Sequence, residues 1–331
     1  MVLEPEWTKA ERTLNFSPMR YRDHPSWQTY RRILRERFGL AIDHEPTERR
    51  RTLRGHDLHV DEWDARIATE AQGMLILVHG GGGNGRVLAP FADRIATMGW
   101  NVIAPDLPGF GLTRPAPDWK GDYAEWPAII AALASEVEGP VVLMGLSMGG
   151  LTAAYAAAQA PDVAGVIATT LLDLSDPGTF VRAARNRALG VVSLASARAM
   201  PFVMDRLSLP LDLAAPLHLM SADPEMTRYF RTDPLLGRRW VPLRFWRTAH
   251  RYRSAPTLPC ELLLVHPGAD EWTPPEASRP TFERITGPKL WRLLDHGSHL
   301  PVEPEAFGPM MDEVGAFMRV RGRATNDIAL A

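Results

Sequence analysis

The chain has 331 residues and a mass of 36.8 kDa, so one large domain with an insertion and two smaller domains are both compatible with its length. Hydrophobic residues make up 45% and charged residues 23%, a globular mixture that excludes a disordered, collagen-like or coiled-coil chain. Lys and Arg total 37 against 39 Asp and Glu, and this net charge of −2 provides no overall basic field to hold nucleic acid or an anionic membrane.

The sequence offers no signal for membrane insertion, secretion or a structural metal. No apolar run approaches the ~18–20 residues that a bilayer span needs, and the opening residues MVLEPEWTKAER are charged where a signal peptide would be hydrophobic. The single cysteine, Cys260, excludes an internal disulfide and cannot build a structural zinc site, which takes about four Cys and His ligands. We therefore expect a soluble, cytoplasmic protein without a metal, a cofactor or stable membrane insertion.

Residues 1–52 are expected to form a helical extension packed on the main body. They are rich in Arg, Glu and Trp, and the segment SWQTYRRILRERFG (residues 26–39) has apolar residues at helical spacing. Gly39 follows the last of these residues and can end the helix.

From residue 53 onward, strands and helices alternate. LRGHDLHVDEWDA (residues 53–65) alternates like an antiparallel strand, and GMLILVHG (residues 73–80) is an apolar run typical of a central strand covered on both faces. The pattern predicts further strands over residues 100–106, 141–146 and 163–172, and helices over residues 86–98, 123–137 and 147–159. Such alternation predicts a parallel sheet with helices on both faces.

The alternation stops after residue 172. Residues 175–255 contain several prolines, helical stretches rich in Leu, Met, Arg and aromatic residues, and no clear strand. Because this segment is too long for an ordinary loop, we expect a helical cap over the sheet. Strands at 260–266 and 290–294 and helices at 275–285 and 305–320 then complete a core formed by residues 53–174 and 256–331.

The sharpest motif is GLSMGG (residues 145–150), directly between an apolar strand and a predicted helix. A serine hydroxyl becomes an effective nucleophile when a tight strand-to-helix turn lifts it clear of the backbone and a base is nearby. Such a turn leaves little room for a Cβ two residues before and after Ser147, and Gly145 and Gly149 supply that room. The helix start also directs free backbone N–H groups, Met148 among them, at an oxyanion beside the serine.

A second glycine-rich motif, HGGGGNG (residues 79–85), follows another apolar strand. Consecutive glycines can turn backbone N–H groups into a concavity that binds a phosphate or an oxyanion. The surrounding residues match neither a dinucleotide-binding nor a P-loop motif, which favours an oxyanion hole with Gly81 as its second donor. We expect His79 to be a buried residue that stabilises the turn rather than a base.

Together these motifs make the chain resemble the α/β-hydrolase superfamily over residues 53–172 and 258–320. The resemblance rests on HGGGG, APDLPGFG (104–111), GLSMGG, HPGADEWTP (266–274) and DHGSHLPVE (295–303). It implies an α/β-hydrolase fold, with a mostly parallel eight-stranded sheet, helices on both faces and a helical cap inserted after strand 6. The chain looks most like the serine hydrolases related to monoacylglycerol lipases, lysophospholipases, proline-releasing aminopeptidases and carboxylesterases.

The resemblance also implies a catalytic order of Ser, then Asp or Glu, then His. Asp270 and His299 each follow a predicted strand, so their loops would open at the same edge of the sheet as Ser147. His299 would take the proton of Ser147 during attack and return it to the leaving alcohol. Asp270 would fix the tautomer of the imidazole and stabilise its protonated form.

Three other residues compete for these roles. His296 lies three residues before His299, but the sequence Gly-Ser-His fits the family pattern better at His299. Glu271 adjoins Asp270 and would point elsewhere, whereas Asp173 follows the sixth strand, a position that some relatives use for the acid. We assign the base to His299 and the acid to Asp270 and keep these residues as alternatives.

The cap gives weaker indications about the substrate. Residues 176–255 hold 13 Arg against 6 Asp and Glu, which indicates either a cationic mouth for acidic substrates or, as we favour, Arg on solvated helix faces. A hydrophobic pocket lining is suggested by Phe202, Met204, Leu207, Met220, Phe230, Trp240, Phe245 and Trp246, and by Trp272 outside the cap.

The sequence therefore predicts a cofactor-free serine hydrolase that cleaves small-molecule esters of hydrophobic acyl groups through an acyl-enzyme. A lactonase, thioesterase, peptidase or C–C bond hydrolase on the same residues remains open. A non-catalytic receptor that keeps the fold is a further alternative. A homo-oligomer is compatible with the sequence.

Overall fold

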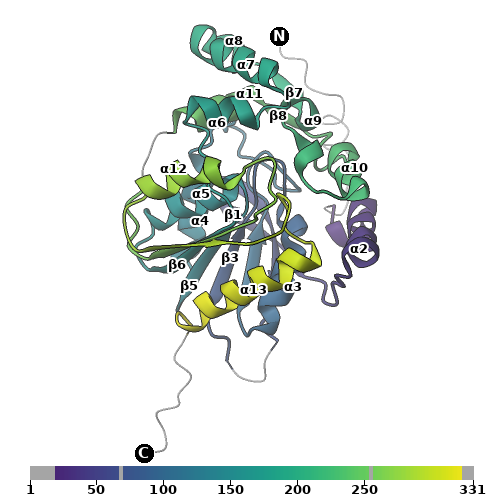
Figure 1. The fold of residues 1–331 in the computed structure, drawn as a ribbon, viewed down its shortest axis with the longest axis vertical. Coiled ribbons are helices and arrows are strands. Elements are labelled where there is room, and N and C mark those ends of the chain that lie inside the picture. Colours follow the sequence, from purple (N-terminus) through teal and green to yellow (C-terminus); the bar gives the residue numbers. More distant parts are fainter. Residues whose placement is uncertain (1–18, 67–69, 253–255, 323–331) are drawn as a thin grey trace, which may run out of the picture.

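The computed structural model describes residues 19–66, 70–252 and 256–322. Its centre is an eight-stranded sheet in the order β1-β2-β4-β3-β5-β6-β9-β10 (Figure 1). β2 pairs antiparallel with β1 and with β4, and every other neighbouring pair is parallel. The strands are β1 (Thr47–Leu53), β2 (His56–Trp63), β3 (Met74–Val78), β4 (Asn101–Pro105), β5 (Val141–Gly145), β6 (Val163–Ala168), β9 (Glu261–His266) and β10 (Lys289–Leu293).

Helices cover both faces of the sheet, which confirms the predicted α/β-hydrolase fold. α4 (Glu125–Ser135) and α5 (Met148–Ala157) pack together against β3, and α12 (Pro275–Arg284) lies on the same side in Figure 1. α3 (Ala89–Thr97) and α13 (Pro304–Arg319) contact each other on the opposite side. Within the described residues, no helix combines the length and the apolar content that a membrane span requires.

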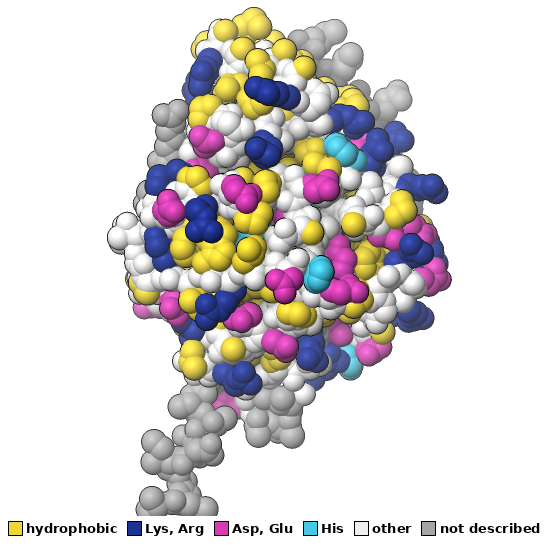
Figure 2. Space-filling model, in the orientation of Figure 1, with side chains coloured by type: hydrophobic (Ala, Val, Ile, Leu, Met, Phe, Trp, Pro, Cys, Tyr) yellow, Lys and Arg dark blue, Asp and Glu magenta, His cyan; other side chains and the backbone are white. Residues whose placement is uncertain are grey.

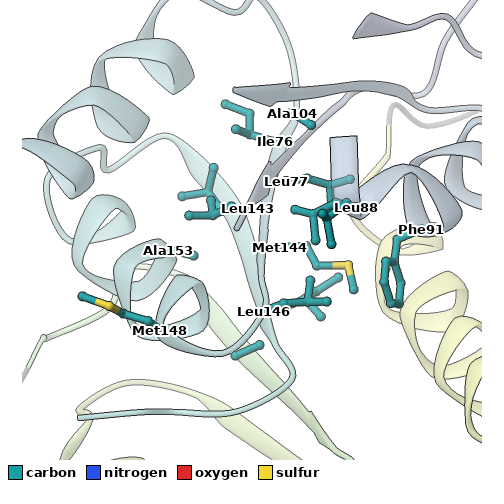
Figure 3. Packing of buried hydrophobic residues seen from close by; sticks show 14 of the residues in the cluster. Ile76, Leu77, Leu88, Phe91, Ala104, Leu143, Met144, Leu146, Met148 and Ala153 are labelled. Atoms are coloured by element: carbon teal, nitrogen blue, oxygen red, sulfur yellow. The ribbon is translucent and has the colours of Figure 1, made fainter. Parts of the chain in front are cut away.

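The central strands are apolar at every position because both of their faces are buried. Ile76 of β3 pairs with Leu143 of β5, and Figure 3 shows both on the side of α5. The next pair, Leu77 and Met144, points to the other side, toward Phe91 of α3. The continuous apolar runs of the sequence therefore correspond to strands covered by helices on both faces.

The structure contains one strand of the sheet that the sequence analysis missed. β1 lies within residues 1–52, where a helical extension was expected, and it pairs with β2 over its whole length. Its sequence TERRRTL has no buried position and is charged, as is common for an edge strand, so no hydrophobic alternation predicts it. The expected helix is present as α2 (Pro25–Phe38), which ends at Gly39 with φ +66°. Residues 1–18 of the expected extension lie outside the described residues.

The elements between β6 and β9, which we call the cap, lie at one end of the molecule beyond the sheet (Figure 1). They include an antiparallel pair of three-residue strands, which corrects the expectation that this segment contains no strand. Each of these strands contains a proline and is too short to show alternation. The cap consists of α6 (Pro177–Ala183), α7 (Arg187–Ala199), α8 (Pro201–Met204), β7 (Ser208–Pro210), α9 (Leu211–Ala214), η3 (Leu217–Leu219), α10 (Pro224–Thr232), β8 (Trp240–Pro242) and α11 (Leu243–Arg251).

A buried network of charged groups connects the sheet to the short helix η2 (Gly85–Leu88). Arg86 donates two hydrogen bonds to Asp61, at 2.6 and 2.8 Å, and lies 3.2 Å from Glu48. His59 lies 3.0 Å from Glu48 and 3.4 Å from Asp106. Burial alone would lower the pKa of His59, but the hydrogen bonds and charges of these carboxylates raise it to about 10. His59 is therefore cationic near neutral pH and, with Arg86, offsets the three buried carboxylates.

Three members of this network also have the geometry of a metal site. Ligand atoms of Glu48, His59 and Asp61 lie within 4.8 Å of one another. Glu48 lies in β1 and the other two lie in β2, so no local spacing in the sequence marks them as a set of metal ligands. The Arg86 guanidinium is bonded to both carboxylates, so a cation would have to displace a buried arginine. We interpret the cluster as an ion-pair network.

Breaking this network should destabilise the fold. Asp61→Asn leaves the Arg86 guanidinium buried with one carboxylate fewer, and we expect the free energy of unfolding in urea to fall by about 3 kcal/mol. Glu313→Gln is the matched control, because Glu313 pairs with Arg292 at an exposed position and its loss should leave the urea midpoint nearly unchanged. Equal effects of the two substitutions would contradict the importance of the buried network.

Candidate active site

Ser147 lies in a sharp turn between β5 and α5. Its backbone has φ +58° and ψ −130°, a conformation that residues with a side chain rarely adopt. A Cβ on Gly145 would lie 2.0 Å from the carbonyl oxygen of Gly149, and a Cβ on Gly149 would lie 2.2 Å from the carbonyl oxygen of Val78. The close approach of strand and helix expected from the motif is therefore present, and it requires glycine at both positions.

The structure brings Ser147, His299 and Asp270 together from three loops. Ser147 Oγ is 2.7 Å from His299 Nε2, and His299 Nδ1 is 2.8 Å from Asp270 Oδ2. A carboxylate can only accept hydrogen bonds, so it places the proton of the neutral imidazole on Nδ1. Nε2 is then the acceptor for the serine hydroxyl, which is the arrangement that nucleophilic attack requires.

Asp270 and His299 are held rigidly. The other carboxylate oxygen, Oδ1, accepts hydrogen bonds from the backbone N–H groups of Trp272 and Thr273, both at 2.9 Å. The Trp272 ring packs against the His299 imidazole with their centroids 4.5 Å apart. Asp270 and His299 are buried, so water does not compete for the hydrogen bond between them.

The glycine-rich loop after β3 borders the serine. A Cβ on Gly80 would lie 2.8 Å from Ser147 Cβ, and Gly81 lines the same cavity as Ser147 and His299. Met148 is the first residue of α5, so its N–H has no acceptor within the helix. Backbone donors from two segments are thus available near the serine hydroxyl.

His79 fixes the start of this loop. Its Nδ1 donates to the carbonyl oxygen of Gly80 at 2.8 Å, and its Nε2 accepts from the backbone N–H of Leu107 at 2.9 Å. Burial lowers the pKa of His79, which keeps the ring neutral. Because both ring nitrogens are occupied, His79 stabilises the turn, as expected, and is not a base.

Hydrogen bonds that were not predicted from the sequence hold the far end of the loop, near Gly85 and Val87. Asp106 accepts a hydrogen bond from the N–H of Gly85 at 2.7 Å and another from the hydroxyl of Tyr21 at 2.9 Å. Tyr30 of α2 donates to the carbonyl oxygen of Val87 at 2.9 Å. The tyrosines lie 85 and 57 residues from their partners, and only the aspartate belongs to a recognisable motif, APDLPGFG.

The three alternative residues lie in other environments. Asp173 forms an ion pair with Arg284 at 2.5 Å and accepts a hydrogen bond from the backbone N–H of Ser175. Glu271 and His296 are exposed to solvent. The hydrogen-bonded set therefore contains Asp270 and His299 and none of the alternatives.

Two cavities lie on opposite sides of Trp246, and one of them contains the serine. The serine cavity, lined by Ser147 and His299, has a volume of about 40 Å³. The cap cavity has a volume of about 50 Å³, and its walls are almost entirely apolar. Trp246 separates the two, since it lines the cap cavity and its ring lies 2.9 Å from a Cβ built on Gly81.

The apolar residues expected to line a pocket fall into three groups. Met220 and Phe230 line the serine cavity, and Met204 and Trp246 line the cap cavity. Phe245 is buried in the core, and Trp272 packs on His299. The expectation is wrong for Phe202, Leu207 and Trp240, whose side chains are exposed to solvent.

Comparison with known proteins identifies a family and several relatives of this chain. The model of the Alpha/beta hydrolase family matches residues 75–309. The chain is 35% identical over 117 residues to the lipase LipV of Mycobacterium tuberculosis, a match spanning 35% of this chain and 41% of that lipase. It is 26% identical over 255 residues to a pimeloyl-[acyl-carrier protein] methyl ester esterase of Neisseria meningitidis, covering 73% of this chain and 76% of that esterase.

Solved structures share the fold at lower identity. The monoacylglycerol lipase of Paleococcus ferrophilus is 23% identical with a TM-score of 0.61, and the match covers 80% of this chain and 99% of that one. A soluble variant of the monoglyceride lipase of Saccharomyces cerevisiae is 14% identical with a TM-score of 0.68, covering 87% and 99%. At these identities the likeness shows the fold alone.

The tight turn at Ser147 predicts that replacing Gly149 by alanine destabilises the protein, whereas the same change at Gly308 does not. Gly149→Ala places a methyl group 2.2 Å from a backbone oxygen, and we expect it to destabilise the protein by about 3 kcal/mol or more. Gly308→Ala is the control, because its Cβ would meet nothing within 4 Å and alanine favours the surrounding helix α13 by about 1 kcal/mol. Thermal unfolding of both variants checks this, and a stable Gly149→Ala protein would contradict the described turn.

Proposed function

The chain belongs to the alpha/beta hydrolase family, and from that premise we propose that it is a serine esterase with a triad of Ser147, His299 and Asp270. The observation that carries the proposal is the unbroken hydrogen-bond path from Asp270 through His299 to the hydroxyl of Ser147. The similarity to a lipase and to a methyl ester esterase supports an ester as the substrate. No cofactor enters the proposed reaction.

In the acylation half of the reaction, Ser147 Oγ attacks the ester carbonyl carbon while His299 Nε2 accepts the hydroxyl proton. The carbonyl oxygen becomes an oxyanion, and the N–H groups of Gly81 and Met148 are the proposed donors to it. When the carbonyl re-forms, the C–O bond to the alcohol breaks and the alcohol leaves with the proton from His299. The acyl group is then bonded to Ser147 Oγ.

Deacylation repeats the same steps with water. His299 accepts a proton from the water as its oxygen attacks the acyl carbon, and the bond to Ser147 Oγ breaks as the proton returns to the serine. Asp270 stabilises the protonated imidazole in both halves because it accepts the Nδ1–H hydrogen bond.

The cap cavity supports a hydrophobic acyl group. Its lining is apolar apart from Ser193 and Arg247, and the Arg247 guanidinium is bonded to Asp205 at 2.6 and 2.7 Å. An apolar cavity of this kind is poorly hydrated and favours hydrocarbon over a polar group. We propose that the acyl chain extends past Trp246 into this cavity.

The nucleophile can be tested directly. A fluorophosphonate should label Ser147, and Ser147→Ala should abolish labelling and lower kcat/KM for p-nitrophenyl esters by about 1,000-fold or more. Ser135→Ala, which changes a serine of α4 that bonds the carbonyl oxygen of Ala131, is the control and should be labelled normally. Peptide mass spectrometry locates the adduct, and labelling at another residue would refute the proposed nucleophile.

The alternative reactions can be distinguished by measuring the activity of the native protein on substrates with different scissile bonds. An ester and a thioester with the same acyl group differ in the leaving group alone, a lactone keeps its leaving alkoxide attached to the acyl group, and an aminoacyl amide presents an amine as the leaving group. The relative kcat/KM values of these four substrates identify the bond that is cleaved. Adduct formation at Ser147 without turnover of any of them would favour a receptor over an enzyme.

Trp246 is expected to limit the acyl chain length. Trp246→Ala removes the wall between the cavities and should raise kcat/KM for p-nitrophenyl decanoate relative to butyrate by roughly tenfold, the discrimination typical of added methylenes in an apolar pocket. Trp240→Ala is the control, because Trp240 is exposed and lines neither cavity. An unchanged ratio in Trp246→Ala would show that the acyl chain does not pass this residue.

A further inference from the structure

The outer end of the cap exposes an unusual amount of apolar surface. Six of its large hydrophobic side chains between residues 191 and 207 are about half exposed or more, with Phe202 at 77% and Val192 at 60%. The other four are Val191, Met200, Val203 and Leu207. We call residues 187–207, which include α7 and α8, the cap apex. Figure 2 shows hydrophobic side chains gathered at the end of the molecule where Figure 1 places these helices.

Helix α7 is apolar on two sides. Leu189, Ser193 and Ala197, spaced four residues apart, line the cap cavity on its inner side. Val191 and Val192 lie on the outer side and are exposed. A helix on the surface of a water-soluble protein normally carries polar residues on its outer side. The outer side of α7 therefore has the composition of a surface that contacts another apolar surface.

The cap apex carries an excess of positive charge. Its residues 187–207 contain Arg187, Arg198 and Arg206 and one acidic residue, Asp205. Arg182, Arg187, Arg198 and Arg206 are exposed, and none of the carboxylates in the described part of the chain forms an ion pair with them.

The nearby carboxylates are already neutralised. Asp205 pairs with Arg244 and Arg247, and Asp212 pairs with Arg185 and Arg231. These contacts leave the exposed arginines of the apex without local compensation. The overall charge of −2 conceals this excess, because the cap alone holds 13 Arg against 6 acidic residues.

These observations distinguish between the surfaces that could cover the apex. A two-fold contact with a second copy would bring the same arginines of both copies together, and their repulsion opposes it. The exposed apolar side chains lie on or next to α7 and α8, which Figure 1 places at the end of the long axis of the molecule, so they suit a deformable partner better than a preformed groove. Arginines interspersed with exposed apolar side chains are the pattern of helices that lie in the interface of an anionic membrane.

We propose that the cap apex docks on an anionic lipid surface, with Phe202 and its apolar neighbours entering the headgroup region and the exposed arginines contacting lipid phosphates. This is association with the surface, in accord with the absence of a membrane-spanning helix in the described residues.

Docking would place the cap cavity next to the lipid. α7 would have the membrane on its outer side and the cap cavity on its inner side, so this one helix would separate an apolar ester in the bilayer from the cap cavity, and Trp246 would separate that cavity from the serine. This delivery step rests on the proposed esterase function, whereas the docking itself does not.

Vesicle sedimentation tests the docking. The 331-residue chain should sediment with vesicles of equal parts phosphatidylglycerol and phosphatidylcholine, and weakly with vesicles of phosphatidylcholine alone. Raising the salt from about 0.15 M to about 1 M should weaken binding, because it shortens the Debye length from about 8 to about 3 Å. Arg198→Gln and Arg206→Gln should each weaken binding about fivefold, and Phe202→Ser about tenfold.

Matched controls separate a local effect from a general one. Arg35→Gln changes an exposed arginine of α2, and Leu293→Ser changes a hydrophobic residue of β10 that is 55% exposed, so both should bind vesicles normally. All variants should hydrolyse a soluble ester within about twofold of the native rate, since these residues line neither the serine cavity nor the cap cavity.

Several outcomes would overturn the proposal. It fails if the native protein does not sediment with anionic vesicles, if binding is equal on neutral vesicles, or if Phe202→Ser and Leu293→Ser behave alike. A dimer in analytical ultracentrifugation that Phe202→Ser dissociates would instead identify the apex as a contact between two copies. Ser147→Ala should bind vesicles like the native protein, so a failure of the esterase proposal and a failure of docking give different results.

Discussion

The close contact of β3, β5 and α5 around Ser147 is the constraint on which the rest of the site depends. Backbone oxygens of Val78 and Gly149 occupy the space where a Cβ would stand on Gly149 and Gly145. This contact forces Ser147 into a positive φ and sets its hydroxyl against His299. The apolar core on both faces of β5 holds the strand in place and so supplies the energy that keeps this conformation (Figure 3).

The oxyanion loop depends on a second set of interactions, which reach the N-terminal segment. Asp106 and the buried Arg86 lie beneath the loop, and the rings of Tyr21 and Trp27 cover the Arg86 guanidinium at 5.0 and 4.7 Å. A guanidinium enclosed by carboxylates and aromatic faces is fully desolvated without being unpaired. Tyr21 and Trp27 lie outside residues 75–309, which the family model matches.

The turn that holds the proposed nucleophile could be predicted from local motifs, whereas the long-range contacts that support the site could not. The turn at Ser147 is specified by glycines within two residues of it, and the central strands by continuous apolar runs. Asp270 and His299 were predicted through the resemblance to a family, because they are 29 positions apart in the sequence and no local spacing rule connects them. β1 was missed because a charged edge strand has no apolar face, and the braces from Tyr21 and Tyr30 because hydrogen bonds over such separations leave no local pattern. Phe202 and Phe230 occur in similar helical contexts, yet one is exposed and the other buried.

Charge is distributed unevenly between the cap and the rest of the molecule. Because the cap carries an excess of Arg within a chain of net charge −2, the remainder of the chain is net negative. An anionic surface would attract one end of such a molecule and repel the other, so even a weak field orients it before any apolar contact forms. The end that is attracted is the end that exposes Phe202 and encloses the cap cavity. Electrostatic orientation and apolar contact would therefore act on the same end of the molecule, and both would bring the cap cavity, which α7 lines, to the side of the lipid.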